Sequence, residues 1–115
     1  MLTLVRVMAA LTTVAFSTVL YAQAFPNKPL RLVVPYPPGG GADITARPIA
    51  QKLSERWAQP VVIDHRGGAS GMIGAEIVAK APPDGYTLMV SASAEVAFNV
   101  ALFPKMPYDP VRDFA

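Results

Sequence analysis

The stretch of residues 30–43 constrains the fold of this chain more than any other. It begins with the apolar run Leu30-Arg31-Leu32-Val33-Val34, which is typical of the first strand of a covered parallel sheet. Three prolines among the next four residues end the strand, because each fixes φ and lacks an N–H. Three glycines then lead into a helical pattern, and a ligand can approach their amides closely. A strand, a glycine turn and a helix N-terminus together favour an anion site.

The same turn also has a purely structural interpretation, as a tight connection between a strand and a helix that binds nothing. Three adjacent glycines after two prolines exceed what such a turn needs, and this favours a ligand. Asp43 either caps the helix or binds a ligand ammonium group, and the cap is the simpler role. Tyr36 either walls a pocket or packs on the loop, and the flanking prolines favour the pocket.

The first 24 residues have the pattern of a targeting segment. Over the 115 residues the hydrophobic content is 52% and the mean hydropathy is +0.34, which is high for a soluble chain. Residues 1–6 carry one positive charge, residues 7–20 are apolar apart from Thr and Ser, and Ala22-Gln23-Ala24 fits a cleavage site. The run is shorter than the roughly 20 residues of a spanning helix, so a secretory signal peptide is favoured over an uncleaved anchor. We expect the mature chain to begin at Phe25.

Composition excludes several classes of site. The chain has no cysteine and a single histidine, His65, so it has no disulfide, no cysteine-linked lipid anchor and no cysteine-rich or histidine-rich metal site. Ten basic and eight acidic residues give a formal net charge of +2, which does not indicate a nucleic-acid surface. We expect a soluble periplasmic protein without a cofactor, a metal or a nucleic-acid partner.

The rest of the pattern alternates between strands and helices. Strands are predicted at residues 30–34, 61–63 and 86–90, and helices at residues 44–58, 72–80 and 95–102. This order predicts an α/β fold with a parallel sheet and right-handed crossovers. The loops that follow the strands, which include residues 64–71 and 91–94, are rich in small residues. In open α/β sheets ligands sit at that edge.

Within the first predicted helix, Pro48 fits only near the start, with Ile44 or Thr45 as the N-cap. Trp57 and Phe98 are most simply core residues. The predicted apolar face of this helix consists of Ala46, Ile49, Ala50, Leu53 and Trp57.

Nucleotide and catalytic motifs are absent from the sequence. Residues 68–74 space their glycines as G-x-x-G-x-x-G, which is not the dinucleotide fingerprint, and no Gly-Lys-Ser/Thr follows a glycine loop. Ser70 does not lie in a G-x-S-x-G elbow. A secreted serine hydrolase that uses Ser70 or Ser91 with His65 is the alternative from a different functional class. Ser91 and Ser93 either donate to an anion or cap the next helix.

A series of motifs in fixed order is more specific than any one of them. It runs through residues 28–43, Ala46-Arg47, residues 59–62, residues 68–75, residues 78–81, residues 84–88, Pro107-Tyr108-Asp109-Pro110 and Asp113-Phe114. Over residues 25–115 the chain resembles the Bug family of periplasmic solute receptors, the TctC-like receptors of tripartite tricarboxylate transporters.

The resemblance implies a two-lobed receptor of the type II periplasmic binding fold, acting as a monomer and not as an enzyme. Such a receptor captures a small carboxylate (a dicarboxylate, tricarboxylate, acidic amino acid or aromatic acid) between its lobes and presents it to membrane permease subunits. The ligand-binding residues carried over by position are Tyr36, Pro38, Gly39, Gly40, Gly41, Ala42, Asp43, Ser91, Ala92 and Ser93.

The chain departs from the family pattern at three places and in length. Family members usually show Asn-Arg-Pro-Gly at His65-Arg66-Gly67-Gly68, Gly at Ser70, and Asn-Pro at Asn99-Val100. They are also much longer, so we expect residues 25–115 to be the N-terminal part of the first lobe, in a fragment or a truncated product. A non-functional remnant of such a receptor is the alternative.

Overall fold

The computed structural model describes residues 24–114. The predicted signal peptide, residues 1–24, therefore lies outside the described residues except for Ala24. The elements, in chain order, are β1 (Leu30–Val34), α2 (Gly41–Trp57), β2 (Val61–His65), η1 (Ala69–Gly71), α3 (Met72–Ala79), β3 (Thr87–Met89), η2 (Ala94–Phe98) and α4 (Asn99–Leu102).

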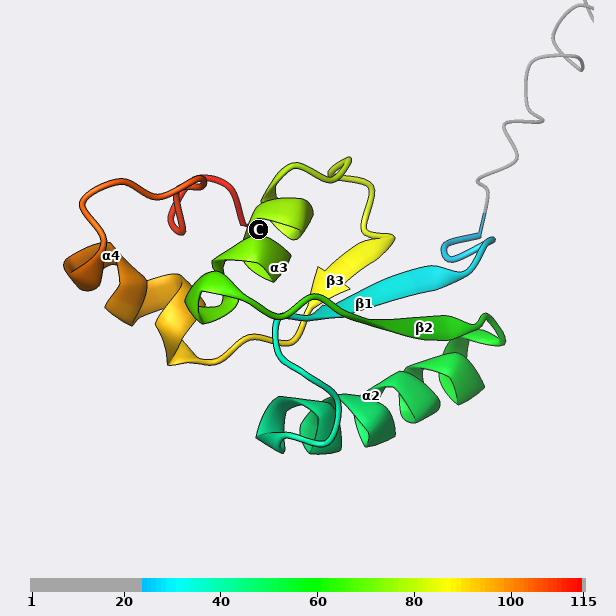
Figure 1. Cartoon of the computed structure of the whole chain (residues 1–115). Helices are drawn as coiled ribbons and strands as arrows, with labels where there is room; N and C mark the ends of the chain where they lie inside the picture. Colours follow the sequence, from blue (N-terminus) through cyan, green and yellow to red (C-terminus); the bar gives the residue numbers. More distant parts are fainter. Residues whose placement is uncertain (1–23, 115) are drawn as a thin grey trace, which may run out of the picture.

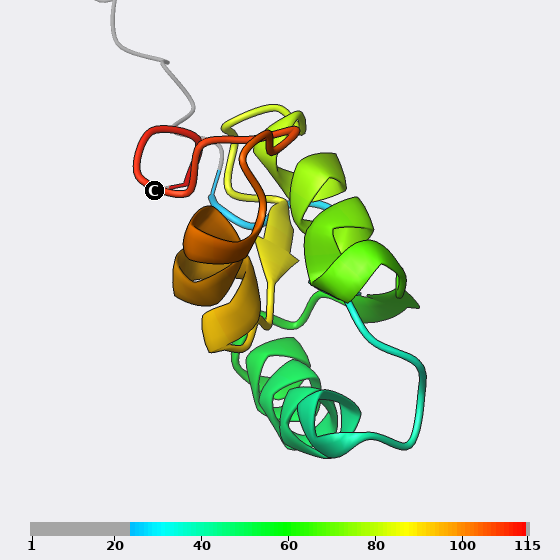
Figure 2. The same ribbon diagram turned by 60° about the vertical axis from the view of Figure 1, so that its left-hand side comes forward.

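The three strands form one parallel sheet in the order β2-β1-β3, which confirms the predicted α/β fold. In the register, Leu30 lies opposite Val61 and Arg31 lies opposite Thr87. Helix α2 covers one face of the sheet and α3 covers the other, while η2 and α4 lie beyond the ends of the strands (Figure 1). The view in Figure 2 shows the same separation of α2 from α3.

The core lies around β1 because that strand has a neighbour on each side. Leu32 and Val34 are buried against Ala46 and Ala50 of α2, whose short side chains let the helix approach the sheet. Since side chains alternate along a strand, Val33 faces away from α2, and it is fully buried as well. The central strand is therefore apolar on both faces, as expected for a covered parallel sheet.

The first helix differs from its prediction at its start. It begins at Gly41, with Gly40 as the extended N-cap residue, and not at Ile44 or Thr45. Pro48 therefore lies in the helix interior, where it cannot donate to the carbonyl of Ile44. Both residues are exposed, so water can solvate the freed carbonyl. On the predicted apolar face, Ile49 is also exposed.

The last predicted helix, residues 95–102, is a π-turn, η2, followed by the short helix α4. Phe98 is 62% exposed, so its prediction as a core residue was wrong. The inward face of this segment is taken by Glu95 and Asn99, which are both fully buried and lie one turn apart. Phe98 consequently points outward.

The strand and helix limits differ slightly from the remaining predictions. Strand β2 extends two residues further than predicted, to His65, and β3 is shorter, covering Thr87–Met89. The second helix ends one residue early, at Ala79. Across residues 24–114, none of the helices combines the length and the apolar character that crossing a bilayer requires.

Candidate functional site

Three loops meet where the parallel strands end. The loop after β1 spans residues 35–40, the loop after β2 spans residues 66–68, and the loop after β3 spans residues 90–93. Backbone hydrogen bonds extend the sheet into them: Arg66 N–H donates to the Val34 carbonyl (2.8 Å), and Val90 N–H donates to the Val33 carbonyl (3.0 Å). The two predicted ligand segments, residues 36–43 and 91–93, therefore follow adjacent strands at one edge of the sheet.

The glycine loop presents backbone donors at the start of α2. The first intrahelical hydrogen bond runs from Ile44 N–H to the Gly40 carbonyl (3.0 Å). The amides of Gly41, Ala42 and Asp43 precede that bond and have no partner within the helix. The dipole of this 17-residue helix adds positive potential at the same end.

The three adjacent glycines differ in whether the backbone conformation requires glycine at their positions. Gly39 has φ +88°, a conformation that glycine adopts readily and other residues rarely adopt. A Cβ on Gly41 would meet nothing within 4 Å, and a Cβ on Gly40 would meet only the Pro37 carbonyl oxygen, at 3.7 Å. Neither residue has a positive φ. The fold alone therefore does not require glycine at positions 40 and 41.

Asp43 has its carboxylate turned into the protein, where only 1% of the residue is exposed. Its Oδ2 accepts hydrogen bonds from Gly39 N–H (2.8 Å) and from Nε and Nη2 of Arg47 (2.9 and 2.8 Å). Its Oδ1 lies 2.9 Å from Nε2 of His65. The carboxylate thus holds the glycine loop against α2 and β2. Its hydrogen bond to Gly39, the residue before the N-cap, stabilises the start of α2. This is similar to the capping role that the sequence favours for Asp43.

The Asp43 network predicts a specific sensitivity to acid. The Gly39 amide is the main cause that lowers the Asp43 pKa from 3.8 to about 2; burial opposes this, and His65 and Arg47 add to it. Because the folded pKa is depressed, the stabilisation is present above pH 4 and is lost as the pH falls towards about 2. We expect Asp43→Asn to be less stable at pH 7 and to lose less stability than the wild type between pH 4 and pH 2. Urea unfolding at each pH measures this, and equal acid sensitivity of both proteins would contradict it.

The loop after β3 is organised by a residue that the sequence analysis did not single out. Glu95 is fully buried, and its Oε2 accepts a hydrogen bond from Ala92 N–H (2.8 Å). Its Oε1 has no hydrogen-bond partner among residues 24–114. Ser91, Ala92 and Ser93 are exposed, and Ser93 makes no side-chain capping bond to η2. A glutamate at the start of a helical pattern carries no sequence signal of burial.

Two more residues join Glu95 in a buried polar cluster. Asn99 donates from Nδ2 to the Ser70 carbonyl (2.9 Å), and its Oδ1 has no hydrogen-bond partner within the described part of the chain. The Tyr108 hydroxyl donates to the Glu95 carbonyl (2.7 Å). The cluster ties the η2 segment to the loop after β2 and to the chain near residue 108.

The serine–histidine arrangement of a hydrolase is not formed. His65 pairs with Asp43, while the Ser70 carbonyl accepts from Asn99. Over residues 24–114, neither Ser70 nor Ser91 hydrogen-bonds to His65, and no group of three or more His, Cys, Asp or Glu side chains is placed to hold a metal ion.

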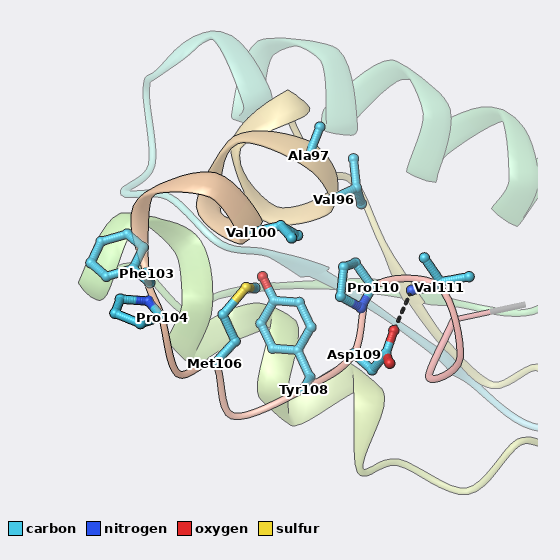
Figure 3. A pocket seen from close by; sticks show the side chains of 10 residues that line it. All are labelled: Val96, Ala97, Val100, Phe103, Pro104, Met106, Tyr108, Asp109, Pro110 and Val111. Carbon is cyan, nitrogen blue, oxygen red and sulfur yellow. Dashed lines mark hydrogen bonds between the residues drawn. The ribbon is translucent and has the colours of Figure 1, made fainter.

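A separate apolar hollow of about 560 Å³ lies between η2, α4 and the segment after them (Figure 3). Val96, Val100, Phe103, Met106 and Tyr108 are among its lining residues. It includes none of the predicted ligand-binding residues, and its apolar lining does not suit an anion.

Comparison with known proteins decides the family. Residues 45–115 match the model of the tripartite tricarboxylate transporter family receptor, TctC. The chain belongs to this receptor family. Among curated relatives, Protein BugT of Bordetella pertussis is 39% identical over 104 residues, which are 90% of this chain and 32% of BugT. The predicted Bug/TctC resemblance is thereby confirmed.

Solved receptors of the same type share the fold. Rpa4515 of R. palustris, with adipate, has a TM-score of 0.73 and 45% identity over 76% of this chain and 29% of that protein. MatC (Rpa3494) from Rhodopseudomonas palustris, with bound malate, has a TM-score of 0.74 and 41% identity over 78% of this chain and 31% of MatC. The chain therefore spans about a third of the length of the receptors it matches. TctC-like receptors are periplasmic solute-binding proteins, not enzymes.

Proposed function

We propose that this chain contributes the first ligand-binding loops of a periplasmic receptor that captures a small carboxylate. The amides at the start of α2 bind the carboxylate, and the loop after β3 completes the site on the same edge of the sheet. The receptor delivers its ligand to the membrane subunits of a tripartite tricarboxylate-type transporter. A second lobe outside these residues closes over the ligand.

The observation that carries this proposal is the pair of exposed glycines at positions 40 and 41. Their backbone is compatible with alanine, and neither has a close neighbour that a Cβ would displace. An anion must come within hydrogen-bond distance of the backbone amides to bind here. The absence of side chains at these two positions leaves room for that approach. The adipate and malate named with the structures of Rpa4515 and MatC support a carboxylate as that anion.

The role of Asp43 follows from the same geometry. Its carboxylate already accepts from Gly39, Arg47 and His65, so it shapes the glycine loop. We include Asp43, with Tyr36, Pro38, Ala42 and the 91–93 loop, in the proposed site. Asp43 acts there by holding the loop and by contributing its backbone amide.

Calorimetric titration of the complete gene product tests the proposal. Succinate, malate, adipate and an aromatic acid form one panel, and the corresponding amides, inorganic phosphate and sulfate form the other. We expect at least one carboxylate to bind with micromolar or better affinity, and its amide to bind at least about tenfold more weakly, because a charged acceptor gains more from the amides and the helix dipole. Binding of phosphate alone, or of none of these anions, would refute the proposal.

A further inference from the structure

Gly67, in the loop after β2, lies against the turn that carries Tyr36. A Cβ added at Gly67 would lie 3.3 Å from Cδ and 3.4 Å from N of Pro37, and 3.5 Å from the carbonyl carbon of Tyr36. Gly67 is exposed and has no positive φ, so neither burial nor backbone conformation requires glycine here. The missing side chain instead permits the close approach of the two loops.

The turn that this glycine contacts is held at both ends. At its start Pro35 is fully buried, and at its end Gly39 N–H donates to Oδ2 of Asp43 (2.8 Å). Between these two anchors, residues 36–38 are half-buried or exposed. A group that presses on the middle of the turn therefore displaces the segment that carries the tyrosine, while the anchors stay in place.

The order of the strands gives the direction of that displacement. β1 lies between β2 and β3, so its loop lies between the loop that contains Gly67 and the loop that contains residues 91–93. The latter loop is held in turn, because Ala92 N–H donates to Oε2 of Glu95 (2.8 Å). A displacement of Tyr36 away from Gly67 therefore narrows the space between Tyr36 and residues 91–93.

We propose that Gly67 is a positioning residue that sets the separation of the two ligand loops and, with it, the length of the carboxylic acid that the receptor accepts. The carboxylate itself binds at the start of α2, beyond the Gly39 anchor, so the contacts that every acid shares stay in place. The rest of the acid occupies the space between Tyr36 and residues 91–93. Small shifts matter there, because binding groups must be held within about 0.5 Å of their productive positions.

The inference rests on the proposed function and is tested by titrating two series of acids into the complete gene product. Succinate, glutarate and adipate form one series, and benzoate, phenylacetate and phenylpropionate form the other. In the series that binds, we expect Gly67→Ala to raise the ratio of the dissociation constants of the longest and the shortest acid about tenfold, because a narrowed site penalises added methylene groups. Gly41→Ala obstructs the amides common to every acid and should leave this ratio unchanged. Gln51→Ala should alter neither the ratio nor the affinities.

The Pro37→Ala substitution tests the contact through which Gly67 acts. It removes Cδ, the atom that the new methyl group would approach most closely. In the Pro37→Ala background, Gly67→Ala should therefore change the ratio less than about twofold, since substitutions that act through one contact are not additive. The same tenfold change in both backgrounds would show that the methyl group does not act through Pro37, and would overturn the inference.

The remaining outcomes also decide the matter. A Gly67→Ala variant that weakens every acid of a series by one factor, or weakens none, would overturn the role in length selection while leaving the carboxylate receptor intact. Failure of this variant to unfold cooperatively in urea would show that Gly67 is kept for packing, and would overturn that role as well. If no carboxylate of the wider panel binds the wild type, the proposed function fails and this inference fails with it.

Discussion

Replacing Gly74 by alanine is expected to lower the free energy of unfolding by about 3 kcal/mol, because the new methyl group would clash with neighbouring atoms. Gly74 lies in the first turn of α3, where the helix packs directly on two loops of the site. A Cβ there would lie 2.7 Å from Cβ and 2.9 Å from Cα of Pro35, and 2.9 Å from the Arg66 carbonyl oxygen. Two of these three neighbours are backbone atoms, so the clash is relieved only by moving α3 away from the sheet.

Urea unfolding of the complete gene product measures the effect, and Gly40→Ala is the matched control. The control adds the same methyl group at a position with no positive φ and only one neighbour, at 3.7 Å. Because Gly40 is the N-cap residue, where alanine is less favourable than glycine, we expect the control to lose at most about 1 kcal/mol, well below the loss from Gly74→Ala. Equal stability of Gly74→Ala and the control would show that α3 does not pack tightly against Pro35 and Arg66.

Replacing Gly41 by alanine is expected to weaken carboxylate binding about thirtyfold or more without lowering stability. The methyl group is placed beside the amides that receive the ligand, so the carboxylate loses at least one charge-assisted hydrogen bond. The fold has room for it, since no atom lies within 4 Å of the position that the Cβ would take. Alanine also has a higher helix propensity than glycine, so the free energy of unfolding should stay the same or rise by roughly 0.5–1 kcal/mol.

Titration with the best-binding carboxylate and urea unfolding of the same preparation separate the two effects. Gln51→Ala changes an exposed residue further along the same helix and should affect neither quantity. A Gly41→Ala protein with unchanged affinity would place the ligand elsewhere and would remove the main support for the anion site. Together, Gly41 and Gly74 distinguish a glycine kept for a ligand from a glycine kept for packing.

The sequence predicted those parts of the fold that depend on local pattern. The apolar runs of β1, β2 and β3 alternate with helical patterns, and this alternation by itself predicts the parallel sheet that the structure has. The glycine loop could be placed at the ligand edge because the carboxyl ends of parallel strands meet there. Helix α2 begins three residues before its predicted start, because Asp43 lies within the first turn of the helix and accepts a hydrogen bond from Gly39.

The rest of the site depends on contacts between segments that are distant in sequence. The burial of Glu95 follows from Gly71, whose missing side chain makes room for the carboxylate. His65, the last residue of β2, is held by Asp43 in the first turn of α2, 22 residues earlier in the chain. Neither pairing leaves a periodic pattern. Phe98 is exposed for a related reason. Its hydrophobicity predicts burial, but the buried polar cluster occupies the inward face of this segment.

The order of the strands also bears on how the chain folds. Of the three described strands, β1 is synthesised first, and its second edge is paired only after β3 has been made, because Leu30 lies opposite Val61 and Arg31 lies opposite Thr87. Each pairing requires a long segment of chain to be closed into a loop, which costs entropy before strand hydrogen bonds repay it. Until β3 is available, the most apolar strand of the sheet has an open edge. This strand is therefore the segment most in need of protection from aggregation while the polypeptide is still incomplete.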